Sequence, residues 1–439
     1  RNACSKKGKE MILKFNVPSW SSILLVYYFT SPIWRAVFFD HIPGGWILNP
    51  IIIIGLLFIT ILKQKSLWNT YWDIIIFYIF VAGAFFIKFF QNPDMADWIG
   101  RTYGVKQMVS WGWIFAYAVI RVQPNLYKML DCLKKIGVVL VSYYAYQSLE
   151  VLRTGYWTYV QFGMTRQTTS NMSWSYGVLT AICFLSIYFF KDKKKWPFVF
   201  AVIGVVGILI YGSRGTLIGL IFGILLLSLL YSQKRMTFRN YLVLFALCGG
   251  IVFGLSDFGL SMISDILMSH GLNSRFIDSI KNFATFEELS NGRSRIWETA
   301  ISLIKTGPFY GYGVYGERNA IYNIGMKWGY SHNIFLEILV DFGWLFGSII
   351  IVVLLFYLVL FFKSSKDKYE KFLVIIFLTI GFELILSNSI WLHSGLWILM
   401  GLIVNHFKYK RQKRDIYFRN FEKDRSKHKH LIRKKFSTL

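Results

Sequence analysis

Residues 329–347 read GYSHNIFLEILVDFGWLFG, and residues 348–362 continue as SIIIVVLLFYLVLFF. The second stretch carries no charge, and crossing a bilayer takes about 20 mostly apolar residues. A membrane span therefore begins beside His332 and carries Glu337 and Asp341 in its first turns. Ionisable groups inside a membrane are costly and usually have a functional or structural partner. We expect this helix to fix the fold class and to carry part of a functional site.

The composition extends this expectation to the whole chain. Of 439 residues, 55% are hydrophobic, 19% are aromatic and only 16% are charged, with a mean hydropathy of +0.45. Soluble domains average about 25% charged residues. We therefore predict an all-α polytopic membrane protein with about twelve spans of sufficient length. The expected spans are residues 20–39, 45–62, 71–90, 105–121, 134–152, 172–190, 196–212, 215–232, 241–258, 334–362, 372–390 and 394–408.

The net charge of +26 first suggests a nucleic-acid partner, but the positions of the charges argue against one. Lysine and arginine gather in short blocks between apolar runs, such as residues 191–195 and 363–371. This is the pattern of cytoplasmic loops under the positive-inside rule. With a cytoplasmic N-terminus, these blocks fall inside, and an even number of spans returns the C-terminus to the cytoplasm. The basic tail 410–439 is expected to lie against anionic membrane lipids.

The same topology divides the chain into segments. Residues 1–10 precede Met11, and we interpret them as a cloning remnant or as upstream sequence. Residues 11–409 form the expected transmembrane domain, with an outer loop at 259–333 between the ninth and tenth spans. A loop of this length in a compact protein is usually functional.

The first candidate for chemistry is a hairpin of two spans, GILIYGSRGTLIGLIFG at residues 207–223, with Arg214 at its tip. Gly212 and Gly215 allow the backbone to turn tightly. At the outer membrane interface, the guanidinium can hold a phosphate in a bidentate fork. The alternative is an arginine that reaches ordinary lipid head groups.

The second candidate is SNGRSRIWETAISLIKTGP at residues 290–308, which predicts a helix ending near Gly307. Arg293 leads an apolar stripe that includes Trp297, so it requires an anionic partner. Arg295 falls on the polar face beside Glu298. Arg293 is therefore the stronger substrate-binding candidate, and Arg295 is either a second one or a solvated partner of Glu298.

The third candidate is the stretch quoted first. A helix N-terminus suits an anionic ligand, and His332 can exchange a proton near neutral pH. Asn333, Glu337 and Asp341 share one helix face. The alternatives are local hydrogen bonding for His332 and a favourable first-turn acid for Glu337, and Asp341 can be one half of a buried pair. His393, in the short outer link 391–393, either lines the same site or is an ordinary loop residue.

Taken together, these segments resemble the O-antigen ligase and polymerase family, and in particular its polysaccharide polymerase branch. The resemblance rests on the order and spacing of SRGT (213–216), NGRSRIW (291–297), GPFYGYGVYG (307–316) and SHNIFLEILVDFGWLFG (331–347). It covers residues 205–350. Residues 1–200 match only as apolar spans of suitable number.

The resemblance implies a GT-C-like helical fold and a glycosyltransferase of the bacterial cytoplasmic membrane whose site faces outward. Such an enzyme takes a glycan from a polyprenyl-diphosphate carrier, usually undecaprenyl, and joins it to an acceptor glycan or lipid without a metal or another cofactor. By motif match, Arg214 and Arg293 correspond to diphosphate-binding arginines and His332 to an essential histidine. A chain-length regulator or a flippase is a possible protein partner.

Two alternatives remain at this point. A ligase would move a finished chain onto a lipid or a protein with the same chemistry. A transporter or flippase would place ionisable groups near the membrane midplane and show repeated halves, whereas this sequence shows no repeat and its charges cluster at the expected outer rim.

Overall fold

The computed structural model describes residues 19–64, 67–91, 105–123, 125–161, 164–168, 171–211, 213–231, 293–326 and 329–409, with the single residues 265 and 269. The expected span 241–258, the expected remnant 1–10 and the basic tail 410–439 lie outside the described residues.

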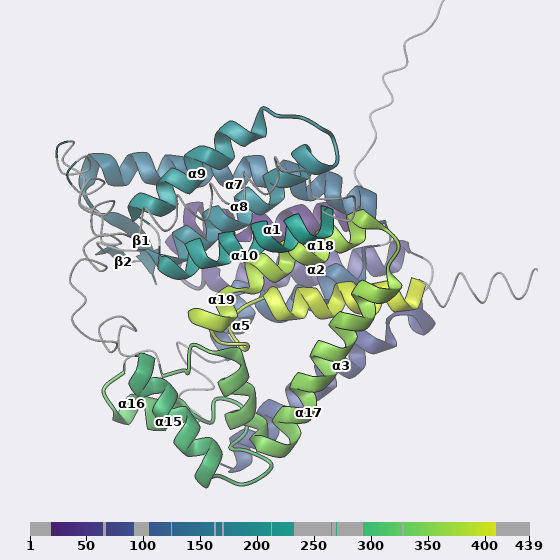
Figure 1. Cartoon of the computed structure of the whole chain (residues 1–439), viewed down its shortest axis with the longest axis vertical. Helices are drawn as coiled ribbons and strands as arrows, with labels where there is room; N and C mark the ends of the chain where they lie inside the picture. Colours follow the sequence, from purple (N-terminus) through teal and green to yellow (C-terminus); the bar gives the residue numbers. More distant parts are fainter. Residues whose placement is uncertain are drawn as a thin grey trace, which may run out of the picture.

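The described chain is almost entirely helical (Figure 1). Its α-helices are α1 Trp20–Val37, α2 Leu48–Lys63, α3 Leu67–Gln91, α5 Val105–Trp111, α6 Ala116–Arg121, α7 Leu126–Thr154, α8 Met172–Phe190, α9 Pro197–Tyr211, α10 Arg214–Tyr231, α15 Arg293–Thr306, α16 Arg318–Asn323, α17 Ile334–Ser364, α18 Lys368–Gly381 and α19 Glu383–Leu386. Residues 395–409 are also helical. Short 3-10 turns η1 Phe39–His41, η2 Gly45–Ile47 and η4 Trp113–Phe115 join some of them.

Several of these helices are long and apolar enough to cross a membrane. Among the described residues there are five such segments, Trp20–His41, Gly45–Lys63, Tyr71–Phe89, Met172–Phe190 and Ile334–Ser364, and α9 and α10 contain shorter apolar stretches. These helices make the chain a multi-pass helical membrane protein. The count of about twelve spans, the GT-C-like arrangement and the orientation of the termini stay predictions.

The span expected at 105–121 is wrong as a single helix. Gly112 separates α5 from η4 and α6, and its φ of 76° is a left-handed conformation that side chains disfavour. A Cβ atom at this position would lie 2.7 Å from the Cδ1 atom of Ile53, so α2 also packs closely here. The backbone turn and the close approach of α2 together explain why glycine interrupts this apolar segment.

The span expected at 372–390 is also wrong in its second half. Helix α18 ends at Gly381, and after Phe382 the chain forms only the short helix α19. Residues 387–394 then turn back before the last helix begins at residue 395. An apolar stretch that looked like membrane crossing therefore folds inward, where it meets the start of α17.

The expected all-α class needs one correction in the loop 153–171. Strands β1 Trp157–Gln161 and β2 Met164–Thr168 form an antiparallel hairpin. The ring of Trp157 is buried against Trp174 at a centroid distance of 5.1 Å. The aromatic contact anchors this hairpin to the start of α8.

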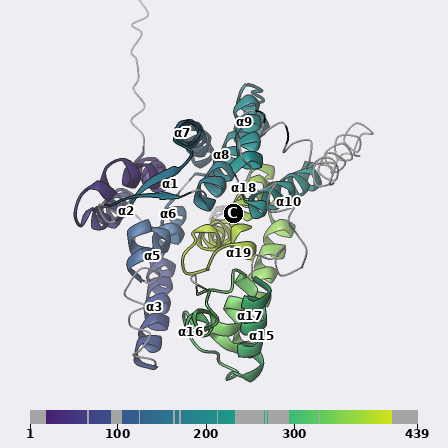
Figure 2. The same cartoon turned by 90° about the vertical axis from the view of Figure 1, so that its left-hand side faces the viewer.

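The helices separate into two groups. Helix α7 lies against α1 and α8, and α8 lies against α9 and α18. Helices α15, α16 and α17 gather on one side of the molecule, away from α7 and α9 (Figures 1 and 2). Helix α15 and the connection to α17 belong to the segment expected as the outer loop 259–333.

Helix α17 is divided into two unlike halves by Gly343, whose φ of 74° and ψ of 167° interrupt the helix. The kink frees carbonyl groups that would otherwise accept hydrogen bonds from the next turn. Those of Val340 and Asp341 accept from the amides of Tyr312 and Gly313 at 2.9 and 2.8 Å. The glycine-rich stretch 307–316 is therefore held in the kink of α17.

The close approach at the kink depends on paired glycines. A Cβ atom on Gly311 would lie 2.2 Å from the Gly343 nitrogen, and one on Gly343 would lie 2.1 Å from the Phe309 oxygen. Both residues also have positive φ values. Two motifs that are separate in the sequence, GPFYGYG and DFGWLFG, thus meet through their glycines.

Candidate active site

His332 lies immediately before α17 in an unusual conformation. Its φ is 53°, in the left-handed region that a residue other than glycine adopts only under constraint. The side chain is 9% exposed, and its ring centroid lies 4.3 Å from that of Tyr330. Among the described residues, its buried Nδ1 atom has no hydrogen-bond partner. A buried ring nitrogen without a partner is available to a ligand.

Charge and burial keep this histidine neutral. Burial lowers the pKa of His332 to about 4, and the positive charge of Arg293 acts in the same direction. The backbone of Ser387 acts in the opposite sense, with a smaller effect. At neutral pH the imidazole therefore accepts or donates a hydrogen bond without carrying a charge.

Asn333 is the N-cap of α17. Its Oδ1 atom accepts hydrogen bonds from the amides of Phe335 and Leu336 at 2.9 and 3.3 Å. These amides are two of the free donors that an anionic ligand at a helix N-terminus would use. The structure thus gives Asn333 a capping role, and a direct role in substrate binding stays a prediction.

Arg293 is the first residue of α15 and is half-buried. Burial lowers its pKa, while Tyr176 and Tyr330 act against this effect. Because Arg293 also influences His332, the cation and the histidine lie within electrostatic range of one another. The structure brings these two sequence candidates together.

The rest of α15 explains how Arg293 is held. Ile296 and Ala300 are buried, as the expected apolar stripe requires. The Trp297 indole donates to the Ser331 carbonyl at 3.0 Å, which joins α15 to the residue before His332. Arg295 is exposed on the other face of the helix. Its expected place on the polar face is confirmed, whereas its role in binding stays a prediction.

Helix α10 begins beside Tyr176 and Ser387, which in turn contacts Tyr330. The Tyr176 hydroxyl forms a 2.8 Å hydrogen bond with the Ser387 hydroxyl, and Tyr330 donates to the Ser387 carbonyl at 3.4 Å. A Cβ atom on Gly215 would lie 2.4 Å from the Tyr176 hydroxyl. Arg214 is the first residue of α10, and its side chain lies outside the described part of the structure. The hairpin and the segment before α17 therefore meet at Ser387, and Arg293 lies within electrostatic range of Tyr176 and Tyr330.

Within the part of the chain that the structure describes, Glu337 binds the turn 387–394 and Arg318, not the first-turn amides of α17 or His332. Its Oε2 atom accepts from the Ile390 amide at 2.8 Å, and its Oε1 atom accepts from the Ser389 hydroxyl. The Arg318 guanidinium lies 3.9 Å from the same Oε1 atom. These contacts fasten the turn 387–394 to α17. They offer no link to His332 among the described residues.

Asp341 has partners that explain its presence in a span. Its Oδ1 atom accepts from the Gly316 amide at 3.0 Å, and its Oδ2 atom accepts from the Trp391 indole at 2.6 Å. Lys88 of α3, which is 2% exposed, acts electrostatically on Asp341 and donates to the Tyr312 carbonyl. This acid joins α17 to the glycine-rich stretch and to the turn after α19.

Arg318 is a central buried cation that the sequence reasoning missed. Its guanidinium stacks on the rings of Tyr315 and Tyr330 at 4.6 and 4.8 Å. It also donates to the Ser389 hydroxyl at 3.2 Å. Tyr330 in turn contacts His332, so Arg318 supports one side of the segment that precedes α17. Its neighbours in the sequence, YGERNA at 315–320, gave only the weak signal of a charged pair after a glycine-rich stretch.

Glu317 is fully buried beside Arg318. Its Oε1 atom accepts from the Ser331 amide at 3.4 Å, whereas its Oε2 atom has no partner among the described residues. Burial raises the pKa of Glu317 to about 8, and Asp341 adds to the effect. The carboxyl group is therefore largely protonated at neutral pH. It braces the residue next to His332.

A second histidine lies near the same turn. The His393 Nε2 atom is 3.2 Å from the Glu383 Oε2 atom, and the His393 Nδ1 atom accepts from the Gly395 amide at 3.0 Å. Asn388 donates to the other Glu383 oxygen at 3.0 Å. Glu383 was hidden in the expected span 372–390, because an acid inside an apolar run gives no sign that the helix ends there.

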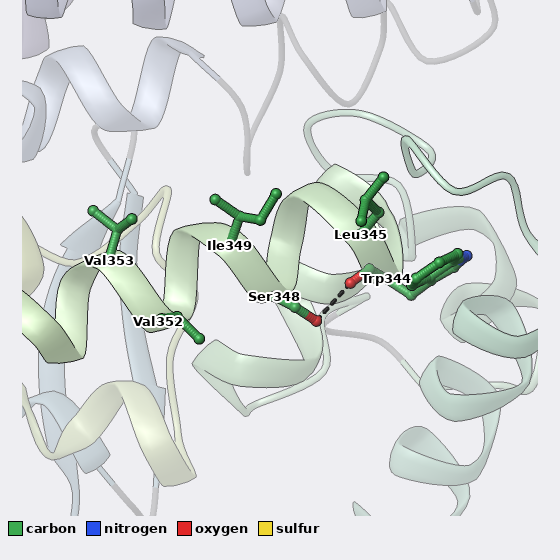
Figure 3. Close-up of a pocket in the computed structure, with 6 residues that line it drawn as sticks. All are labelled: Trp344, Leu345, Ser348, Ile349, Val352 and Val353. Carbon is green, nitrogen blue, oxygen red and sulfur yellow. Dashed lines mark hydrogen bonds between the residues drawn. The ribbon is translucent and has the colours of Figure 1, made fainter.

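The second half of α17 has a different surface. An outward-facing apolar hollow of about 300 Å³ lies along Trp344, Leu345, Ser348, Ile349, Val352 and Val353 (Figure 3). The Ser348 hydroxyl donates to the Trp344 carbonyl of its own helix. The hollow therefore offers hydrocarbon contact and no reactive group, unlike the polar half of α17.

A match to a known family lies over part of the chain that carries the site. Residues 198–352 match the family model described as O-antigen ligase, Wzy_C, which agrees with the family resemblance found in the sequence. The assignment to the polymerase branch stays a prediction. The ComP-specific O-oligosaccharyltransferase of Acinetobacter baylyi is 32% identical over 102 residues, a match that covers 21% of this chain. The chain spans only 18% of the length of that curated relative.

Proposed function

We propose that this protein is a membrane glycosyltransferase that moves a glycan from a polyprenyl-diphosphate carrier to an acceptor hydroxyl, without a metal. The observation that carries the proposal is the position of Arg293 beside a neutral, partly unsatisfied His332, next to the start of α10 at Arg214. The match of residues 198–352 to the O-antigen ligase family supports it.

The leaving group sets the task of the arginines. When the bond between the sugar and the diphosphate breaks, negative charge develops on the phosphate oxygens. Arg293 is already partly desolvated, so its interaction with this charge is stronger than it would be in water. We assign diphosphate binding to Arg293 and Arg214. Arg295, Asn333 and Glu337 then serve only secondary roles, because one is exposed and the other two have structural partners.

The acceptor sets the task of His332. A sugar or serine hydroxyl attacks best when its hydrogen is held by an acceptor, and a neutral imidazole supplies one. Direct displacement of the diphosphate inverts the anomeric carbon. The site would face the outer side of the bacterial cytoplasmic membrane, with both chain termini in the cytoplasm. This orientation follows from the basic blocks such as 191–195.

The nature of the acceptor separates two versions of the proposal. In the polymerase version, the acceptor is another carrier-linked repeat unit. In the ligase version, a finished glycan moves onto a lipid or a protein. The ligase version gains weight from the description of the matching family and from the relative, which is named as an O-oligosaccharyltransferase.

The proposal is tested by substituting Arg214→Gln, Arg293→Gln and His332→Ala in cells that depend on this gene. We expect each change to abolish glycan transfer while the protein still inserts in the membrane. Lys305→Gln is the matched control, because Lys305 is an exposed cation on the same helix as Arg293. Normal product in all three site variants would refute the proposal.

The deletion strain distinguishes the two versions. Short repeat units accumulating on the carrier indicate a polymerase, and long polymer retained on the carrier indicates a ligase. Purified protein supplied with a carrier-linked glycan in the outer leaflet provides the direct assay. Transfer there excludes a transport role as the main activity.

A further inference from the structure

The proposed transfer leaves one proton to be placed. The acceptor hydroxyl loses its proton as its oxygen bonds to the anomeric carbon, and some group must take it. His332 can hold that hydrogen in a hydrogen bond. Its burial and the charge of Arg293 nevertheless oppose the imidazolium ion that full transfer would form. A carboxylate in the same site is chemically better suited to keep the proton.

Glu383 is such a carboxylate. It opens α19, the short helix between α18 and the turn 387–394, and its side chain is 14% exposed. One oxygen accepts from Asn388 at 3.0 Å, and the other lies 3.2 Å from His393. Because each carboxylate oxygen has two lone-pair sites, both oxygens retain capacity for another hydrogen.

The surroundings of Glu383 connect it, through shared neighbours, to the site of Arg293 and His332. Helix α19 lies against both α10 and α17. Tyr176 is within electrostatic range of Glu383 and also of Arg293. The chain leaves α19 directly into Ser387, whose amide donates to the Glu383 carbonyl at 2.7 Å and whose own carbonyl meets Tyr330.

His393 fixes the orientation of this carboxylate. Its Nδ1 atom accepts a hydrogen bond from the Gly395 amide, so in the neutral ring the proton resides on Nε2 and points to Glu383. Both ring nitrogens are then occupied. His393 therefore orients Glu383, and it cannot itself receive the acceptor proton.

We infer that Glu383 is the general base of this site, oriented by His393, while His332 positions the acceptor hydroxyl. This inference rests on the proposed function. In the step, the acceptor oxygen forms a bond to the anomeric carbon and its proton passes to a Glu383 oxygen. The electron pair of the broken carbon–oxygen bond leaves with the polyprenyl diphosphate, whose charge Arg293 and Arg214 stabilise.

Azide provides the decisive experiment, because it is an anionic nucleophile that needs no base. With purified Glu383→Ala and an undecaprenyl-diphosphate-linked oligosaccharide, we expect transfer to the hydroxyl acceptor to fall by about 10²–10⁴-fold. The KM for the donor should stay close to that of the unchanged protein. Added sodium azide should restore donor cleavage and give a glycosyl azide of inverted configuration, with undecaprenyl diphosphate released.

Controls separate this role from a structural one. Glu298→Ala removes an exposed carboxylate on α15 and should leave both reactions unchanged. Arg293→Gln should not regain activity with azide, because azide does not replace the cation that stabilises the leaving diphosphate. If Glu383→Ala is unstable, Glu383→Gln keeps the Asn388 contact geometry and permits the same assay.

The outcomes are distinguishable. Wild-type kcat in a Glu383 variant, or a folded variant that azide does not rescue, overturns the role of Glu383. If the Arg293 and His332 variants are inactive at the same time, the proposed function stands. Failure of the unchanged protein to cleave the carrier-linked donor overturns the proposed function itself.

Discussion

Two charge clusters lie near opposite ends of α3, and they are built differently. The Asp73 cluster consists of Asp73, Tyr117, Arg121, Asn405 and Lys408, and the Asp341 cluster consists of Lys88, Glu317, Arg318, Glu337 and Asp341. Asp73 and Lys88 are separated by about 22 Å along the helix at the usual rise. Only the second cluster lies beside the candidate site.

The difference is in how completely the acids are paired. Arg121 donates through two nitrogens to both oxygens of Asp73, and Tyr117 and Lys408 add further contacts. Because this bidentate contact pairs both oxygens of Asp73, we interpret the Asp73 cluster as structural. The Asp341 cluster instead holds three acids against two cations, and one oxygen of Glu317 has no partner among the described residues. We therefore infer that Glu317 does more than hold the helices together, because its contact with Ser331 links it to the site.

The largest effects should come from the two arginines. Arg318→Met leaves the buried Glu337 without its cation, which typically costs about 3–5 kcal/mol in the free energy of unfolding. Arg121→Met should cost less, because Asp73 is partly exposed and keeps its contact with Lys408. Thermal unfolding in detergent measures both. We expect the folded fraction of Arg121→Met to keep its kcat, whereas that of Arg318→Met loses most of it because Tyr330 and His332 are no longer braced.

If both folded variants kept full kcat, the Asp341 cluster would have only a structural role, and the proposed difference between the clusters would be wrong. Arg318→Lys is the matched control. Lysine keeps the charge but loses the planar group that stacks on Tyr315 and Tyr330. It should recover most of the stability and only part of the kcat.

The next effect concerns the glycine contact that brings the Asp341 cluster together. Gly343→Ala places a side chain in a backbone conformation that costs about 1–3 kcal/mol, and it adds a clash with the Phe309 carbonyl. We expect a lower melting temperature and lower activity. Gly55→Ala in α2 is the control, because nothing lies within 4 Å of its added Cβ atom. Equal melting temperatures of the two variants would contradict this account of the kink.

Glu317 provides a pH test of the Asp341 cluster. Its folded pKa of about 8 exceeds the ordinary value of 4.5, so between these values the folded state binds more protons than the unfolded state. Its contribution to stability is therefore complete below pH 4.5 and is lost as the pH rises through 8. We expect Glu317→Gln to flatten the fall in unfolding free energy across this window. If the unfolding free energy of the variant and of the unchanged protein fell in parallel with pH, the raised pKa of Glu317 would be contradicted.

Sequence patterns predicted the features that depend on local signals. The apolar runs of α1, α2, α3 and α8 and the stripe of α15 are visible as length and periodicity. His332 and Arg293 were found through motif order, and the structure brings them together. A prediction of this kind needs only neighbours in the sequence.

Features set by distant partners were not predictable in this way. Arg318 reads as a solvated loop cation until Tyr315 and Tyr330 enclose it. Glu383 reads as an acid inside a span until the chain turns at Phe382. Asp341 remained unexplained until Trp391 and Gly316 were placed against it. In each case, the partner comes from a segment whose position only the folded chain defines.

The smallest effect should come from Lys408, which lies beside Asp73. Lys88, which lies near Asp341, provides the comparison. Lys408 lies 3.4 Å from Asp73 with 28% of its side chain exposed, so Lys408→Gln should cost less than about 1 kcal/mol, and less again at high salt. Lys88 is 2% exposed and faces Asp341 and Glu317, so Lys88→Gln should cost more and respond little to salt. Unfolding measured at two ionic strengths compares them. A strong, salt-independent loss at Lys408 would show that the Asp73 cluster is as sensitive as the other. The difference between the two clusters would then depend only on the contact between Arg121 and Asp73.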